Sequence, residues 1–164
     1  MGASARLAAV RAAAVVRILT GVIFLAEGWS KVAGAFVRGG FAEQAREMAG
    51  QTWPFWKHVL ETAVVPRADL FGWLFALGEA AAGVGLILGL ATRVAAGGGA
   101  ALMLLVLLGS GRGEPGATWD MWVTAGLTAK LALLLLALIL ATNPGQTWGF
   151  DGWIGRRRGR VRRS

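Results

Sequence analysis

The chain has 164 residues, of which 55% are apolar, with a mean hydropathy of +0.57 and a formal net charge of +8. Because a soluble domain of this length cannot bury so large an apolar share, the composition predicts a single integral membrane domain. The absence of cysteine excludes disulfide bonds, thiol redox chemistry and thiolate metal ligands, and the single histidine, His58, leaves too few ligands for a haem or most zinc sites.

The first predicted membrane span runs from Ile18 to Phe36 and follows an Ala-rich start that carries three arginines. The basic start and the small residues at 33–35 also fit a cleaved signal peptide weakly. Glu27 and Lys31, however, lie inside the apolar stretch and argue against cleavage. The segment is therefore interpreted as a retained helix.

The polar segment that follows, from Arg38 to Arg67, contains two stretches of mixed apolar and charged residues, 41–49 and 55–65. Their roughly helical spacing predicts two short interfacial helices in an outer loop between the first two spans. These helices either lie on the outer surface of the membrane or roof a cavity.

Three further spans are predicted, at 68–90, 94–109 and 121–142. Because Ala91-Thr92-Arg93 leaves room only for a tight turn, the second and third spans should be antiparallel neighbours. The third span carries no charge and is expected to face lipid along most of its length, packing through Gly97 and Ala101. The predicted fold is an all-α, integral membrane four-helix bundle in one domain.

The distribution of Lys and Arg predicts the orientation of the bundle. Ten of these residues lie in the N-terminal segment, the turn at Arg93 and the basic tail at 152–164, and five lie in the two opposite loops. Both termini should therefore be cytoplasmic, in a multi-pass protein of the inner (plasma) membrane. The tail is interpreted as an anchor beside anionic headgroups and not as a nucleic-acid site, because no aromatic residue is interleaved among its arginines.

Four ionisable residues lie inside the predicted spans: Glu27, Lys31, Glu79 and Lys130. A rise of about 1.5 Å per residue places three of them near one level in the middle of the bilayer, with Lys31 about one turn away. A charge at this depth costs about 2.5–3.5 kcal/mol on insertion scales, so the four should pair inside the bundle. They either form an ion-pair network that fixes helix register or line a polar cavity that binds a quinone, a proton or a small anion.

Three stretches of the sequence form a recognisable pattern. They are Arg17-Ile18-Leu19-Thr20-Gly21 with Glu27-Gly28-Trp29-Ser30-Lys31, then Gly78-Glu79 through Gly83 to Leu88-Gly89-Leu90-Ala91-Thr92-Arg93, and last Asn143-Pro144-Gly145 through Trp148 to Asp151. In these stretches the chain resembles the DoxX and DoxD-like family of small four-helix membrane proteins, which includes the small subunit of thiosulfate:quinone oxidoreductase. The resemblance implies a membrane subunit linked to quinone-dependent redox chemistry, often beside a second subunit, with candidate functional residues at the matching positions Gly28, Lys31, Glu79 and Arg93.

The resulting hypothesis is a membrane subunit of a quinone-linked oxidoreductase. Glu27, Lys31 and Glu79 are the predicted catalytic residues, which bind and protonate a quinone, and Lys130 and Trp29 join Lys31 and Glu79 as predicted quinone-binding residues. No metal, haem or flavin is indicated, so electrons would come from a small sulfur anion such as thiosulfate, oxidised at a partner subunit or directly at the outer face. A homo-oligomer is a further arrangement that the sequence leaves open.

The alternative is a non-enzymatic membrane accessory or scaffold protein that docks a redox or assembly partner. A small transporter is disfavoured, because four spans without an internal repeat or a broken helix offer little machinery for alternating access in a monomer. His58 on the outer loop is interpreted as an interfacial residue, and Arg67 and Arg112 as charges at span ends that either anchor the topology or attract an anion.

Overall fold

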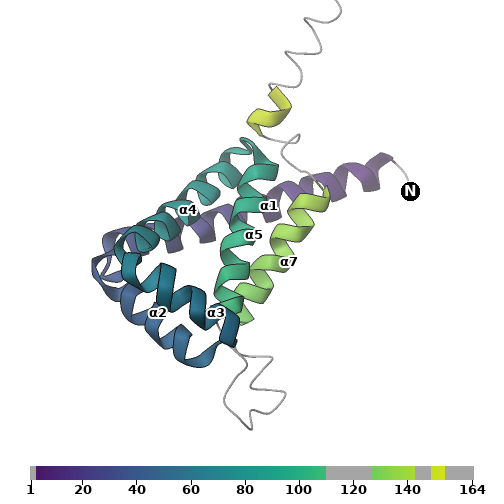
Figure 1. Ribbon diagram of the computed structural model, residues 1–164. Coiled ribbons are helices and arrows are strands. Elements are labelled where there is room, and N and C mark those ends of the chain that lie inside the picture. The colour runs from purple at the N-terminus through teal and green to yellow at the C-terminus, as the bar shows by residue number, and fades with distance from the viewer. Residues whose placement is uncertain (1–2, 110–126, 143–148, 154–164) are drawn as a thin grey trace, which may run out of the picture.

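The computed structural model describes residues 3–109, 127–142 and 149–153, and these residues form helices and turns without a strand (Figure 1). Within these described residues, three helical segments are long and apolar enough to cross a membrane, Leu7–Arg38, Pro54–Leu88 and Thr92–Gly109. The predicted all-α membrane bundle is thereby confirmed. Its long helices are α1 (Ala3–Ala33), α4 (Ala68–Leu88), α5 (Thr92–Gly109) and the shorter apolar α7 (Leu127–Thr142).

Helix α1 differs from the first predicted span at both ends. It begins at Ala3, well before Ile18, because the Ala-rich start has a high helix propensity that a search for apolar spans overlooks. It ends at Ala33, and the 3₁₀ turn η1 (Phe36–Arg38) follows. Lys31 therefore lies in the last turn of α1.

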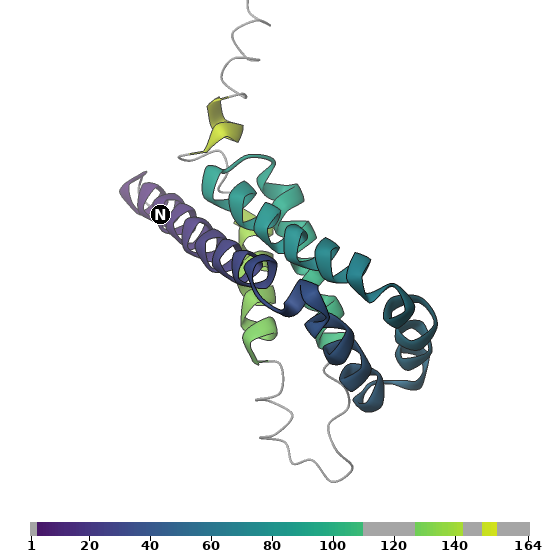
Figure 2. The same ribbon diagram turned by 90° about the vertical axis from the view of Figure 1, so that its left-hand side faces the viewer.

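The two short helices predicted between the first two spans are present. α2 (Gly40–Gln51) is followed by α3 (Pro54–Val59), and the π turn η2 (Leu60–Val64) and the 3₁₀ turn η3 (Val65–Arg67) connect α3 to α4. Figures 1 and 2 show α2 and α3 together at one end of the bundle, which we call the α2–α3 end. The hydroxyl of Thr52, just after α2, donates a hydrogen bond to the carbonyl of Leu108 and thereby ties this end to the last turn of α5.

Helices α1 and α4 pack antiparallel and make backbone contact at three glycines, Gly21, Gly28 and Gly83. A Cβ atom at Gly28 would lie 2.5 Å from the backbone nitrogen of Ala80, and one at Gly83 would lie 2.5 Å from that of Leu25. Small residues allow such close packing of membrane helices, and any larger residue here would push them apart. The contact at Gly28 places the last turn of α1 beside the middle of α4.

Helix α5 packs between α4 and α7 through a different face from the predicted one. The buried face carries Ala96, Gly99 and Met103, whereas Ala101 is exposed and a side chain at Gly97 would meet no neighbour. The prediction of packing through Gly97 and Ala101 is therefore wrong. Small residues occur on several faces of α5, so composition alone does not select the one that packs. The core that α5 joins also contains Phe24, Ala82, Leu86, Ala129, Leu136 and Ile139.

A residue from the far end of the sequence closes the predicted tight turn between α4 and α5. The carboxylate of Asp151 accepts hydrogen bonds from the backbone N–H groups of Ala91, at 2.8 Å, and Thr92, at 2.9 Å. The N–H of Asp151 donates in turn to the carbonyl of Gly89. A carboxylate in this position stabilises the start of α5, because free N–H groups and the helix dipole both attract negative charge. We call these four residues the α4–α5 clasp.

Several predictions concern residues outside the described ranges. They include the start of the fourth span at 121–126, of which the described part, 127–142, is α7. The others are Arg112, the segment Asn143-Pro144-Gly145 with Trp148, and the basic tail from residue 154 onward.

Candidate functional site

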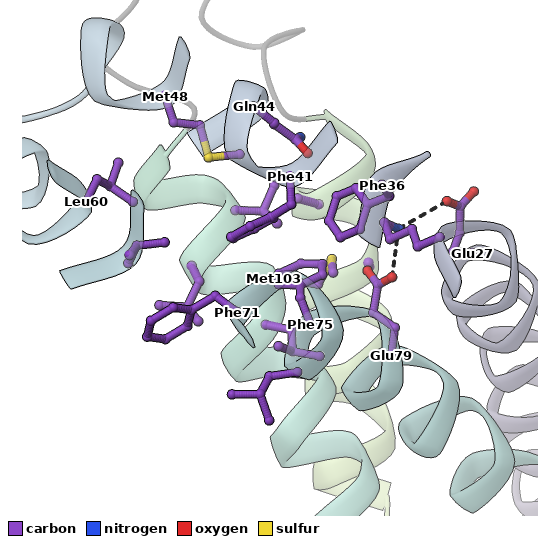
Figure 3. Close-up of a pocket in the computed structure, with 18 of the residues that line it drawn as sticks. Glu27, Phe36, Phe41, Gln44, Met48, Leu60, Phe71, Phe75, Glu79 and Met103 are labelled. Carbon is purple, nitrogen blue, oxygen red and sulfur yellow. Dashed lines mark hydrogen bonds and ion pairs between the residues drawn. The ribbon is translucent and has the colours of Figure 1, made fainter. Parts of the chain in front are cut away.

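A cavity of about 530 Å³ lies among α1, α4, α5 and α7, and α2 and α3 roof it (Figure 3). Its wall is mostly aliphatic and aromatic, and its volume is within the roughly 300–1,000 Å³ of typical ligand pockets. From the roof, Phe41, Gln44 and Met48 of α2 and Trp56 of α3 line the cavity. The structure thus shows the second of the two arrangements that the sequence allowed for the short helices.

Three of the four charged residues predicted at bilayer depth come together on one side of this cavity. Lys31 Nζ donates to Glu79 Oε2 at 2.7 Å and lies 3.4 Å from Glu27 Oε2, one helical turn away on α1 (Figure 3). All three side chains line the cavity. We call Glu27, Lys31 and Glu79 the ion-pair triad.

The packing of α1 on α4 explains why Lys31 reaches Glu79. Gly28 contacts the backbone of Ala76, about one helical turn before Glu79, and that of Ala80, the residue directly after Glu79. Lys31 lies almost one turn beyond Gly28 on the same side of α1. The close contact at Gly28 therefore sets the distance between the two charged groups.

Exposure differs strongly within the ion-pair triad. The side chain of Glu79 is 5% exposed, that of Lys31 21% and that of Glu27 63%. The buried carboxylate has the shorter contact with Lys31, as expected where less solvent competes for the charge. The triad therefore extends from the surface of the helix bundle to the buried side of the cavity.

Three phenylalanines adjoin the ion-pair triad and were not predicted as site residues. The ring centroids of Phe36, Phe41 and Phe75 are 5.4–6.5 Å apart, and Lys31 Nζ lies 5.8 and 5.9 Å from the rings of Phe36 and Phe75. Such distances allow a cation–π interaction with the ammonium group. The available sequence signal was the spacing of Phe75 and Glu79, four residues apart on one helix face.

The structure does not bring the other predicted site residues to the ion-pair triad. Lys130 is half-buried on α7 and does not line the cavity, although its neighbour Ala129 does. Trp29 is 67% exposed on the surface of α1. Arg93, at the start of α5, and His58, on α3, are both exposed. Gly28 serves the contact between α1 and α4 and offers no side chain to a ligand.

A second charged group, Arg17, is fully buried beside the α4–α5 clasp. Burial raises the pKa of Asp151, but hydrogen bonds from Thr92 and Ala91 and the charge of Arg17 lower it by more, so its pKa lies below the ordinary value. Sequence reasoning missed this arrangement. Arg17 and Asp151 were noted only as members of separate stretches, and nothing in their spacing brings them together.

The chemistry of the cavity suits an apolar molecule with a polar end. The ammonium group of Lys31 can donate to a carbonyl or other oxygen acceptor, and the two carboxyl groups can accept or release a proton. The surrounding phenylalanine rings offer flat apolar contacts. Within the described residues, no three His, Cys, Asp or Glu side chains gather as a metal site would require.

Comparison with known proteins supports the family resemblance. The sequence profile of the DoxX family matches residues 12–109, which include the whole ion-pair triad and the roof of the cavity. No curated protein and no solved structure matches the chain. The match is to the family as a whole, so the narrower resemblance to thiosulfate:quinone oxidoreductase stays a prediction. Because the match spans more than half of the sequence, the chain belongs to the DoxX family.

Proposed function

We propose that this protein is a membrane subunit that binds a quinone in the cavity and supplies protons when the quinone is reduced. The observation that carries the proposal is the Lys31–Glu79 ion pair in the wall of an otherwise apolar, aromatic-lined cavity of about 530 Å³. A quinone matches this pattern, because it combines a flat apolar ring with carbonyl oxygens that accept hydrogen bonds. Quinones also dissolve in the bilayer from which such a cavity is filled.

In the proposed complex, a quinone carbonyl accepts a hydrogen bond from Lys31, and the ring lies against the phenylalanine rings of the cavity wall. Full reduction adds two electrons and two protons to the quinone and converts both carbonyl oxygens to hydroxyl groups. Glu79, 2.7 Å from Lys31 and on the buried side of the cavity, is placed to supply a proton to the same oxygen. Lys31 stabilises the negative charge that develops on this oxygen as electrons arrive.

The electrons come from outside the chain in this proposal, since the sequence has no cysteine pair and no flavin or dinucleotide fingerprint. The donor is a small sulfur anion such as thiosulfate, oxidised at the outer face or at a partner subunit. The distribution of basic residues supports cytoplasmic termini in the plasma membrane, with the α2–α3 end on the outer side. The roof of the cavity would then be the part nearest to an external donor.

Quinone binding by the purified chain in lipid nanodiscs tests the proposal. Native protein should bind a short-chain quinone saturably, and Lys31→Ala and Glu79→Gln should each weaken binding. Lys57→Ala and Glu61→Gln are matched controls, because these residues lie on the exposed surface of α3 and η2 outside the cavity lining. Absence of quinone binding and of redox activity in the intact complex would contradict the proposal and favour the accessory or scaffold function.

A further inference from the structure

The ion-pair triad contains two carboxylates but only one cation. Lys31 Nζ lies within 3.4 Å of an oxygen of each carboxylate, so both compete for the same ammonium group. With all three groups ionised, the triad would carry one uncompensated negative charge among apolar helices, which is unfavourable. Binding of one proton removes this charge. We propose that the triad holds one exchangeable proton and passes it between Glu27 and Glu79 through Lys31.

Exposure gives the two carboxyl groups different roles. Glu27, with 63% of its side chain exposed, is the carboxyl group that a proton donor outside the bundle can reach, whereas Glu79, with 5% exposed, is enclosed by the bundle. Lys31 lies between them and contacts both. Glu27 is therefore the entry group, and Glu79 is the group that presents the proton to the cavity.

The transfer conserves charge and needs no other reactant. In the first state Glu27 is a neutral carboxyl group, Lys31 is an ammonium group and Glu79 is a carboxylate. An N–H bond of Lys31 breaks first, as its proton moves to Glu79 Oε2 and leaves a neutral amine. The O–H bond of Glu27 then breaks as its proton moves to the lone pair of this amine. Lys31 ends as an ammonium group, Glu27 as a carboxylate and Glu79 as a neutral carboxyl group. The 2.7 Å contact allows the step from Lys31 to Glu79 directly, whereas the 3.4 Å distance between Glu27 Oε2 and Lys31 Nζ must shorten for the other step.

Within residues 3–109, 127–142 and 149–153, the other charged groups near α1 and α4 do not line the cavity. On the elements that pack against these helices, Arg38 lies on η1, Lys130 on α7 and Arg93 at the distant start of α5. Asp69 lies in the first turn of α4 and is exposed. The charged residues of α2 are also exposed; they are Glu43, Arg46 and Glu47. Among the described residues that line the cavity, the groups that carry charge are therefore the three members of the triad.

Infrared spectroscopy of the purified full chain in nanodiscs, without added quinone, tests this proposal. The native protein should show the C=O stretching band of one protonated carboxyl group, which shifts in D₂O. Glu27→Gln and Glu79→Gln each leave one carboxylate for Lys31 and should remove the band. Glu61→Gln, on the surface of η2, should retain it. A native spectrum without the band, or a band that persists in both triad variants, overturns the proposal.

The entry role of Glu27 has a separate test. Glu27→Asp keeps the number of carboxyl groups but moves the carboxyl away from Lys31 by one methylene group, so the band should remain and its shift in D₂O should slow severalfold. An unchanged exchange rate contradicts entry through Glu27. The use of this proton in quinone reduction rests on the proposed function, but these spectra do not. A protein that shows the predicted bands and binds no quinone would contradict the function alone.

Discussion

Lys31 Nζ lies 2.7 Å from Glu79 Oε2, although the two residues are 48 positions apart and belong to different helices. This contact joins α1 to α4 on the side of the cavity, at the end of α1 that the glycine contact brings against α4. It is therefore both a structural link and the polar end of the proposed binding site.

Removal of one partner of this ion pair should lower the free energy of unfolding by more than removal of both. Glu79→Leu leaves Lys31 with the exposed Glu27 alone and is expected to lower the free energy of unfolding by about 3 kcal/mol. The double variant Lys31→Met/Glu79→Leu leaves the site with only the 63% exposed carboxyl group of Glu27 and no buried charge, so it should be closer to the native protein. Denaturant titration in micelles measures both changes. A double variant as unstable as the sum of the single variants would show that the two residues are not coupled.

Gly28→Ala should separate α1 from α4 and weaken the ion pair. The added methyl group would lie 2.5 Å from the backbone nitrogen of Ala80, and a backbone atom cannot move aside as a flexible side chain can. We expect a loss of about 1–3 kcal/mol in the free energy of unfolding. Gly97→Ala is the matched control, because its methyl group would meet no atom within 4 Å. Equal stability of the two variants would contradict the close contact.

The same displacement should be visible as a change in distance between the helices. The native chain has no cysteine, so a pair of cysteines introduced on α1 and α4 reports this distance without interference. Disulfide formation across the pair should be slower in the Gly28→Ala background and unchanged in the Gly97→Ala background.

Asp151→Asn should weaken the α4–α5 clasp in a pH-dependent way. The loss of a capping carboxylate is expected to lower the free energy of unfolding by about 1 kcal/mol at neutral pH. Because the pKa of Asp151 in the folded protein lies below its ordinary 3.8, the contribution of its charge is fully present above pH 3.8 and is lost as the pH falls through the lowered folded value. The stability difference between native protein and variant, measured across this range, should shrink with acidification. A difference that is constant with pH would exclude a role for the charge.

Phe75→Leu should reduce quinone affinity with little effect on the fold. The ring of Phe75 lies in the cavity wall and 5.9 Å from Lys31 Nζ, so its loss removes both an apolar contact and a cation–π contact. A decrease in affinity of roughly five- to tenfold corresponds to the usual strength of one aromatic pair contact. Phe150→Leu is the control, because Phe150 is half exposed and far from the cavity lining. Equal affinities of the two variants would place the ligand elsewhere.

Local sequence properties predicted the helices well and their mutual packing less well. The second span was expected from residue 68, where α4 begins, because its apolar run starts sharply there. The depths of Lys31 and Glu79 along the bundle could be estimated approximately by counting residues along the two helices. The rotation of α5, with Met103 inward and Ala101 outward, depends on which neighbour packs best, and no periodicity in its sequence specifies that.

The cavity and the α4–α5 clasp could not be predicted for a related reason. The cavity exists because Phe41 and Met48 of α2 face α4 and α5, and this requires the chain to turn back after Ala33. The clasp joins Asp151 to residues about 60 positions earlier. Contacts between residues so far apart in the sequence depend on how the helices pack. The pattern of a single sequence does not indicate them.

The end of α1 has a consequence for the distribution of charge around Lys31. Helix α1 ends at Ala33, shortly after Gly28, which contacts Ala76 and Ala80 in the middle of α4. The carbonyl end of a helix carries roughly half a negative charge, which most spanning helices present to the headgroups. Here that partial charge adds to the two carboxylates around Lys31. The ammonium group of Lys31 thus faces a helix terminus as well as two carboxyl groups, so replacement of this lysine should disturb the electrostatic balance of the bundle more than replacement of either glutamate of the triad.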